Sequence, residues 1–172
     1  MLFENAIIMA AGRGMRMMPL TDKIPKAMAP INSSTLIAER IKKLKVYFKN
    51  VHITVGYKGA MLSKHVIEHD VSSVINTEGQ GNCWWVFNSL IKNISDPLFV
   101  FTCDNLVDLD FDKYKNDYKY FNSPSCMIIP VKPVKGIEGD YIFHNNYKIN
   151  EINRKKISDI YCSGVQIINP KK

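Results

Sequence analysis

The sequence predicts a single α/β domain with a Rossmann-like, mixed but mostly parallel sheet that carries helices on both faces. Apolar runs of strand length begin at Asn5, Val51, Ser73 and Leu98, and segments with helical periodicity separate them. Runs without polar alternation are typical of parallel strands covered by helices on both faces. The chain of 172 residues can bury one substantial core but not two comparable ones. We therefore expect one domain over residues 1–172.

Helices are expected in the segments that join these strands. They cover residues 35–48, about 59–69 and about 82–93. Ser33 or Ser34 is the expected cap of the first helix, because a serine hydroxyl can accept from a free amide of the first turn. The aspartates at 108, 110 and 112 are expected to cap or solvate a further helix.

The last third of the chain has a different pattern. Strands are expected from Cys126 and from Ile160, and a hairpin from Asp140 that turns on Asn145 and Asn146. Antiparallel strands of this kind, added to a parallel set, make the predicted sheet mixed.

The formal charge of +7 is dispersed along the chain. Lysines of the helix over residues 35–48 lie opposite its apolar side and form a solvated face. Because no helix-turn-helix, zinc-finger or RNP pattern accompanies the charge, nucleic acid is not an expected partner; an RNA-binding protein is the alternative that the charge leaves open.

The four cysteines form no C-x-x-C pair, which indicates reduced thiols and neither a zinc site nor a disulfide framework. No apolar run has the length of a membrane span, and the N-terminus lacks the pattern of a secretion signal. A cytoplasmic location without a membrane partner is therefore expected. The oligomeric state stays open, a homo-oligomer included.

The loop that follows the first expected strand combines glycines, cations and prolines between residues 10 and 31. Gly12 and Gly14 allow backbone N–H groups to approach a phosphate closely. Cations follow at Arg13, Arg16, Lys23 and Lys26. A dinucleotide fingerprint would need glycine where Met17 stands, and the Walker A pattern is missing. The loop thus indicates a site for anions of another kind.

These residues, A-A-G-x-G-x-R followed by P-L-T and P-K, resemble the signature of the sugar-phosphate nucleotidyltransferases, the nucleotide-sugar pyrophosphorylases. The resemblance implies a nucleotide-diphospho-sugar transferase-like fold. It also implies Mg²⁺-dependent transfer of NMP from an NTP to a sugar 1-phosphate, with release of pyrophosphate, in nucleotide-sugar biosynthesis for a capsule or surface polysaccharide. The loop departs from the family at Met15, where threonine is common.

The resemblance assigns roles within this loop and at the end of the fourth expected strand. It implies that Arg16 holds the departing pyrophosphate and that Lys26 bridges the α-phosphate and the incoming phosphate. It implies a metal-binding role for Asp104, for which Mg²⁺ is the expected ion; capping of the next turn is the structural alternative. The implied nucleotide contacts of the loop are Ala10, Ala11, Gly12, Arg13 and Gly14.

The stretch T-E-G-Q-G-N-C-W-W from Thr77 resembles the base-reading loop of the family. Candidate nucleotide contacts are Glu78, Gln80, Gly81 and Asn82. Trp84 and Trp85 could stack on a ligand, but the apolar segment around them favours packing in the core.

The implied acceptor contacts are Asn105, Glu138, Gly139, Arg154 and Gly164. The family usually places a Glu-Lys pair where this chain has Asn153 and Arg154. The loss of a carboxylate there leaves the acceptor open, so a cytidylyltransferase for a small non-sugar phosphate, such as phosphocholine or a phosphorylated amino acid, is an alternative. A non-catalytic nucleotide-binding module is another. Gly164 is expected to leave room for the acceptor.

Two patterns complete the interpretation. Members of the family usually continue past the S-G-V-Q-I-I-N-P strand to a second metal-binding aspartate, so the chain is expected to lack the C-terminal part of the family domain; completion of the metal site by water or another carboxylate is the alternative. The segment H-V-I-E-H from His65 matches an inverted zinc protease motif, but no third ligand is evident, and surface histidines are the simpler interpretation.

Overall fold

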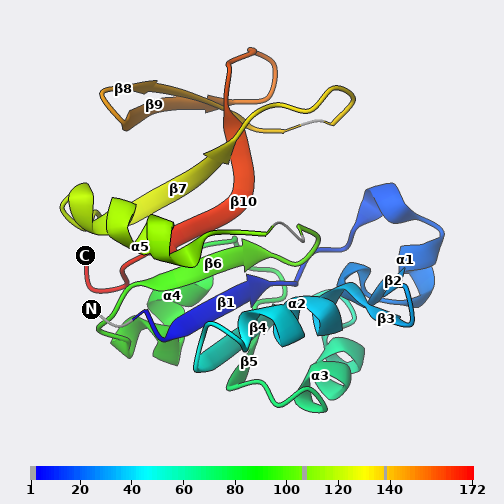
Figure 1. Ribbon diagram of the computed structural model, residues 1–172. Helices are drawn as coiled ribbons and strands as arrows, with labels where there is room; N and C mark the ends of the chain where they lie inside the picture. The colour runs from blue at the N-terminus through cyan, green and yellow to red at the C-terminus, as the bar shows by residue number, and fades with distance from the viewer. Residues whose placement is uncertain (1–2, 106–107, 138) are drawn as a thin grey trace.

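The computed structural model describes residues 3–105, 108–137 and 139–172. Its eight-stranded sheet has the order β5-β4-β1-β6-β10-β8-β9, with β7 paired to β10 beside this path (Figure 1). The parallel strands are β1 (Asn5–Met9), β4 (Asn50–Val55), β5 (Ser73–Asn76) and β6 (Leu98–Thr102). Strand β10 (Tyr161–Ile168) pairs antiparallel with β6. The predicted mixed α/β fold is thus confirmed.

Helices cover both faces of the parallel strands, which explains why these strands lack polar alternation. On one face, Ile8 lies in a cluster of buried side chains from α2 (Leu36–Leu44), α3 (Gly59–Ile67) and α5 (Phe111–Tyr120). On the other face, Ile7 packs with α4 (Trp84–Asn88) and the 3₁₀ helix η3 (Leu90–Asn93). Neighbouring residues of β1 therefore belong to different clusters, and both must be apolar.

The cap of α2 differs from the prediction. The Thr35 hydroxyl accepts from the Ala38 amide at 3.2 Å, so Thr35 and not Ser33 or Ser34 is the N-cap. Ser34 is instead held in a two-stranded sheet of β2 (Pro30–Ile31) and β3 (Ser34–Thr35), which fixes the helix start one residue later. The helix ends at Leu44, four residues before the predicted end.

The single helix predicted for residues 82–93 is broken at Ser89. Its backbone is extended, with φ −123° and ψ 176°, and separates α4 from η3. The Ser89 hydroxyl donates to the Trp85 carbonyl at 2.7 Å and accepts from the Ile91 amide at 3.2 Å. This side chain thus competes with the helical backbone bonds, as serine often does.

The last third of the chain forms antiparallel strands, as predicted. The strands β7 (Cys126–Val131) and β10 rise from the parallel part toward the hairpin of β8 (Tyr141–Asn145) and β9 (Lys148–Asn153) (Figure 1). The residues with positive φ at the turn are Asn146 (48°) and Tyr147 (63°), one position later than predicted. The Asp110 carboxylate caps α5 by accepting from the Lys113 amide at 2.9 Å, as expected of this aspartate.

The remaining short elements precede α2. They are the 3₁₀ helices η1 (Met15–Met17) and η2 (Lys26–Met28) and the one-turn helix α1 (Leu20–Lys23). Over the described parts of the chain, every helix is too short or too polar to cross a membrane.

Replacement of the α2 cap is expected to destabilise the fold. Thr35→Ala removes the acceptor for the Ala38 amide and also the 2.9 Å contact of the Thr35 hydroxyl with the His65 ring. A loss of about 1 kcal/mol in the free energy of unfolding is expected, measured by urea denaturation. Ser34→Ala is the matched control and should change it by less than about 0.5 kcal/mol. Equal losses in the two variants would contradict the assignment of the cap.

Candidate active site

A cavity of about 180 Å³ opens at the carboxyl ends of the parallel strands. Figure 1 shows β1 and β6 pointing toward the segment that carries α1. The cavity is lined by Met9, Ala11, Gly12, Lys26, Thr54, Thr77, Gln80, Gly81, Asn82, Trp85, Thr102, Cys103 and Asp104. Segments far apart in the sequence meet here because parallel strands end at the same edge of a sheet, where α/β folds bind their ligands.

The loop after β1 forms one wall of the cavity through Ala11 and Gly12. Ala10 lies beneath it, fully buried, and its amide donates to the Thr54 carbonyl at 3.1 Å and to the Thr54 hydroxyl at 3.2 Å. The Ala10 amide therefore anchors the loop to β4. It is not free for the nucleotide contact that the sequence predicts for this residue.

Gly14 allows the loop to fold back onto Lys26. Its φ of 69° lies in the left-handed region, and a Cβ atom at this position would lie 2.8 Å from the Lys26 Cβ. The Gly14 carbonyl accepts from the Met17 amide at 2.9 Å and from the Thr21 hydroxyl at 3.1 Å. Thr21, the last residue of the P-L-T motif, thus has a structural role: its buried side chain fixes the turn that holds Lys26.

The two loop arginines lie outside the cavity walls. The guanidinium of Arg13 lies over the Tyr57 ring, 5.3 Å from its centroid. Arg16 is exposed on η1. The structure therefore brings Lys26, but neither Arg13 nor Arg16, to the cavity surface.

Lys26 and Asp104 form an ion pair across the cavity. Their side chains are 22% and 41% exposed, so both groups are partly open to solvent. Burial raises the pKa of Asp104, but the hydrogen bond and charge of Lys26, together with hydrogen bonds from the backbone and the Thr102 side chain, outweigh it and lower the pKa. Asp104 is therefore ionised at neutral pH, and Lys26 is oriented toward it.

Asp104 suits a magnesium ion bound together with a triphosphate. Among the described residues that line the cavity it supplies the one carboxylate, and the described chain contains no group of three or more histidine, cysteine, aspartate and glutamate side chains arranged for a metal. Mg²⁺ is commonly bound by one or two carboxylates, with substrate phosphates and water completing its shell. The donor set thus fits a metal that arrives with its nucleotide.

Two predicted acceptor residues, Asn105 and Gly164, make contacts that hold the turn containing Asp104 in place. The Asn105 side chain donates to the Ser163 carbonyl and joins the end of β6 to β10. Gly164 has a φ of 77°, and a Cβ atom there would lie 2.6 Å from the Thr102 hydroxyl oxygen. The space beside Gly164 is thus occupied by Thr102, which holds Asp104, and not left open for an acceptor as expected.

The segment after β5 supplies further wall residues of the cavity. Gln80, Gly81 and Asn82 line the cavity, as the predicted base contacts should. Glu78 is exposed and outside the cavity walls, and its amide donates to the Asn76 side chain at 3.0 Å. The structure therefore brings three of the four predicted base contacts to the cavity.

Two further predicted acceptor residues, Gly139 and Arg154, are absent from the cavity walls. Arg154 binds the Asp140 carboxylate, with Nε 2.5 Å from Oδ1 and Nη2 3.4 Å from Oδ2. Gly139 faces the Tyr161 ring so closely that a Cβ atom would overlap it. Glu138 lies outside the described residues.

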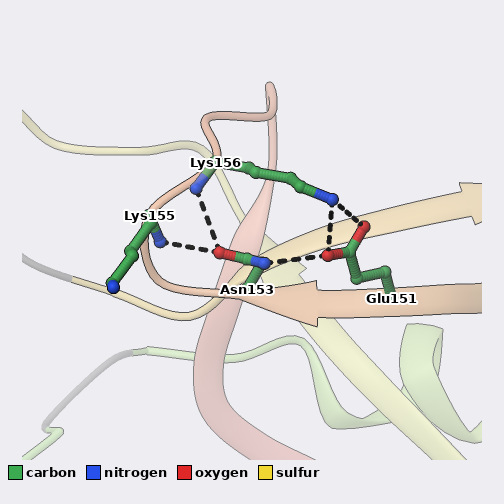
Figure 2. Close-up of polar contacts among 4 residues, drawn as sticks. All are labelled: Glu151, Asn153, Lys155 and Lys156. Atoms are coloured by element: carbon green, nitrogen blue, oxygen red, sulfur yellow. Dashed lines mark hydrogen bonds and ion pairs between the residues drawn. The ribbon is translucent and has the colours of Figure 1, made fainter.

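Asn153 organises the turn after β9 (Figure 2). The side-chain oxygen Oδ1 of Asn153 accepts from the backbone amides of Lys155 (2.8 Å) and Lys156 (3.1 Å). Its side-chain nitrogen Nδ2 donates to the Glu151 carboxylate at 2.8 Å. Lys156 in turn forms an ion pair with Glu151 at 2.8 Å. A carboxylate and a cation are thus paired beside the position where the family's Glu-Lys pair was expected. The sequence feature that could have predicted the contact between Glu151 and Asn153 is their two-residue spacing, which places both side chains on one face of β9.

Sequence reasoning missed several residues at the ends of the strands. Met9, Thr54, Thr77, Thr102 and Cys103 all line the cavity. Burial and, after it, the neighbouring Asp104 charge raise the pKa of the Cys103 thiol to about 11, so the thiol is protonated and unsuited to act as a nucleophile. The available sequence signal was position, because each of these residues lies within two positions of the carboxyl end of an expected parallel strand.

The comparison with protein families gives the site a context. Residues 5–137 match the family model described as nucleotidyl transferase. The chain belongs to the nucleotidyl transferase family. The matched range contains the loop after β1, the segment after β5 and Asp104, while Arg154 and Gly164 lie beyond it.

Individual nucleotidyl transferases are similar in sequence or in fold. The bifunctional protein GlmU of Methanococcus aeolicus is 30% identical over 115 residues, which are 66% of this chain and 28% of that protein. The chain thus spans less than a third of that relative. The structure of HddC from Yersinia pseudotuberculosis superposes with a TM-score of 0.77 at 22% identity, over 98% of this chain and 77% of HddC. HddC has also been solved in complex with GMP-PN.

The inositol-1-phosphate CTP transferase of T. maritima also has this fold. It superposes with a TM-score of 0.77 at 18% identity, over 99% of this chain and 72% of that protein. At such low identity, both structural likenesses establish the fold alone. Because the two superpositions cover 98% and 99% of this chain, they include the antiparallel strands that follow residue 137, the last residue matched by the family model.

Substitution of Gly14 is expected to disturb the cavity loop. Gly14→Ala places a Cβ at positive φ and against Lys26, and a loss of about 1–2 kcal/mol in the free energy of unfolding is expected from the backbone strain alone. Gly12→Ala is the matched control, because a Cβ there meets no atom within 4 Å. Its free energy of unfolding should stay unchanged or rise by up to about 1 kcal/mol. Urea denaturation of both variants measures the difference, and a stable Gly14→Ala protein would refute the packing argument.

Proposed function

We propose that the chain transfers NMP from an NTP to a sugar 1-phosphate, forming an NDP-sugar and pyrophosphate. The observation that carries the proposal is that one cavity is lined by Gly12, Lys26 and Asp104 together with Gln80 and Asn82. The cavity thus combines a cation and a carboxylate, suited to phosphates and a metal ion, with side-chain amides suited to a base. Family membership and the HddC complex with GMP-PN support a nucleotide as the ligand.

The charges of the cavity match the electrostatic demand of the reaction. An oxygen of the acceptor phosphate forms a bond to the α-phosphorus, and the bond to the bridging oxygen of the leaving pyrophosphate breaks. Both reactants are anions, so cations must offset their repulsion. Lys26 is proposed to donate to the α-phosphate and the incoming phosphate, since its ammonium group already lies at the cavity surface beside Asp104.

Magnesium is the proposed cofactor. Asp104 and the triphosphate oxygens would hold the ion, which when bound supplies positive charge to the phosphates. Asp104 is ionised and fixed by Thr102, so its oxygens are already oriented before any ligand enters.

Arg16 and Arg13 are proposed to contact the phosphates outside the cavity. Ligand pockets are usually larger than about 300 Å³, whereas this cavity measures about 180 Å³. A nucleoside triphosphate would therefore extend beyond it over the exposed loop. Arg16 on η1 would then hold the departing pyrophosphate.

A second candidate function keeps the chemistry and changes the acceptor. Arg154 is bound to Asp140, and the family's Glu-Lys pair is replaced by the Asn153 turn. A small non-sugar phosphate is therefore the alternative acceptor, with CTP as donor, which the shared fold of the inositol-1-phosphate CTP transferase makes a reasonable test. A non-catalytic nucleotide-binding module is the third candidate. For the first function, transfer to a sugar 1-phosphate, the proposed location is the cytoplasm. The proposed use of its NDP-sugar product is the synthesis of a surface polysaccharide.

Pyrophosphate release separates these candidates. The purified chain is incubated with Mg²⁺, each of CTP, UTP, dTTP, GTP and ATP, and sugar 1-phosphates, inositol 1-phosphate or phosphocholine. Release with a sugar 1-phosphate supports the first function, and release only with inositol 1-phosphate or phosphocholine supports the second. Binding of an NTP without release supports the module. A thermal-shift panel measures binding, because a ligand at a hundred times its Kd stabilises by about 2.7 kcal/mol.

Removal of the Lys26 ammonium group is expected to stop turnover. Lys26→Ala should lower kcat by two to three orders of magnitude, or roughly 2.7 to 4 kcal/mol, as loss of a donor to transition-state charge does. Lys23→Ala removes the same charge from an exposed residue of α1 and should leave kcat within about threefold of the unaltered chain, since surface changes have small effects. Near-normal pyrophosphate release by Lys26→Ala would remove its proposed role.

A further inference from the structure

Tyr57 follows β4 at the edge of the sheet where the cavity opens. It comes two positions after Val55, the last residue of that strand. Its side chain is half-buried and does not line the cavity. The proposed reaction assigns no role to Tyr57, although this residue contacts three separate points of the loop after β1.

The first contact joins the backbones of the two segments. The Tyr57 amide donates to the Ala11 carbonyl at 3.0 Å. The segments lie so close that a Cβ atom on Gly56 would be 2.9 Å from both the Cβ atom and the carbonyl oxygen of Ala11. Glycine at position 56 therefore allows this approach, which fixes Tyr57 relative to the start of the loop.

The hydroxyl group of Tyr57 makes the second contact. It donates to the Thr21 carbonyl at 3.1 Å, across 36 positions of the sequence. Thr21 is itself buried, and its hydroxyl donates to the Gly14 carbonyl at 3.1 Å. The tyrosine side chain is thus held at its base by the backbone and at its tip by the hydroxyl, so its ring is a fixed surface.

The ring of Tyr57 makes the third contact, with the exposed side chain of Arg13. The Arg13 guanidinium lies 5.3 Å from the ring centroid, and the Lys58 ammonium group lies 5.5 Å from it. Two cations that share one ring repel each other. Among the described residues no carboxylate forms an ion pair with either of them. Both charges are therefore available to an anion that comes from outside the chain.

The position of Arg13 suits the outer phosphates of a nucleotide. Gly12, the residue before Arg13, lines the cavity, and so does Thr54, three positions before Tyr57. A triphosphate that extends beyond the cavity would therefore pass over this part of the loop. An exposed arginine loses conformational freedom when it binds an anion, and one that is already held on a ring has less to lose.

We infer that Tyr57 is a positioning residue, whose ring holds the Arg13 guanidinium in place for the β- and γ-phosphates of the NTP. The inference deepens the proposed function and rests on it, because it requires a nucleotide whose α-phosphate lies at Lys26. Tyr57 acts through Arg13 and does not touch the nucleotide. A purely structural role of Tyr57 would affect every ligand of the cavity, whereas this role affects only ligands with phosphates beyond the α-position.

Binding of an NTP and of its NMP separates the two roles. Isothermal titration with CTP, UTP, dTTP, GTP and ATP in Mg²⁺ identifies the NTP that the unaltered chain binds most tightly. Tyr57→Leu removes the ring and is expected to raise the Kd of this NTP about fivefold, the effect of losing an exposed cation–π contact. The Kd of the matching NMP should stay within about twofold.

Tyr57→Phe is the matched control, because it keeps the ring and removes only the hydroxyl group. Its Kd for the NTP should stay within about twofold of the unaltered chain. A loss equal to that of Tyr57→Leu would assign the effect to the hydroxyl and overturn the inference. Equal losses for NTP and NMP in Tyr57→Leu would show a purely structural role and also overturn it.

A double-mutant cycle tests whether the ring acts through Arg13. Arg13→Ala should itself weaken NTP binding, and Tyr57→Leu should cause no further loss in the Arg13→Ala background, because coupled residues are not additive. A further loss of about fivefold in that background would contradict the inference.

Arg13→Lys tests the ring without altering Tyr57 and changes only an exposed side chain. Lysine keeps the charge but lacks the planar group that stacks on a ring, so the Kd of the NTP should rise about threefold. A Kd equal to that of the unaltered chain would overturn the inference and leave the proposed function in place. Absence of binding of all five NTPs to the unaltered chain would overturn both.

Discussion

The ion pair between Lys26 and Asp104 joins two loops that are 78 positions apart in the sequence. Two glycines with positive φ serve this contact. Gly14 leaves space for the Lys26 side chain, and Gly164 leaves space for Thr102, which binds Asp104. Because a Cβ atom at either position would overlap a neighbouring side chain, glycine leaves the space in which the two charges meet. In the absence of substrate the pair neutralises itself, so neither charge requires an external partner.

The electrostatics of the site extend behind the visible cavity. Arg40 of α2 is buried at 1% exposure, and its guanidinium lies 5.2 Å from the centroid of the Phe101 ring. Burial lowers the pKa of Arg40, while the negative charge of Cys103, when that thiol is deprotonated, and the charge of Asp104 oppose that shift. An arginine retains its proton even so, because a guanidinium group stays protonated far above neutral pH. A fixed positive charge therefore lies beneath the end of β6 and adds to the attraction of the cavity for phosphate.

The two parts of the chain contribute differently to the site. The parallel part, within the matched family range, supplies every residue that lines the cavity. The antiparallel part supplies support, through the bond from Asn105 to β10, and a hairpin region with two ion pairs, Arg154–Asp140 and Lys156–Glu151. This division is consistent with a nucleotide site that is ready-formed and an acceptor side whose residues must exchange partners when a substrate binds.

The sequence by itself determined which apolar segments form the parallel strands, the position of the glycine- and lysine-containing loop after the first of them, the family and most of the residues that line the cavity. These features follow from local chemistry: buried parallel strands need apolar side chains on both faces, and close approach to phosphate needs glycine and lysine. Tertiary structure alone decided the cap at Thr35, the break at Ser89 and the pairing of Arg154 with Asp140. It also decided which tryptophan reaches the cavity, Trp85 and not Trp84. Each of these four features depends either on contacts between distant segments or on competition between local hydrogen bonds of similar strength. Neither cause produces a periodic pattern of residues in the sequence.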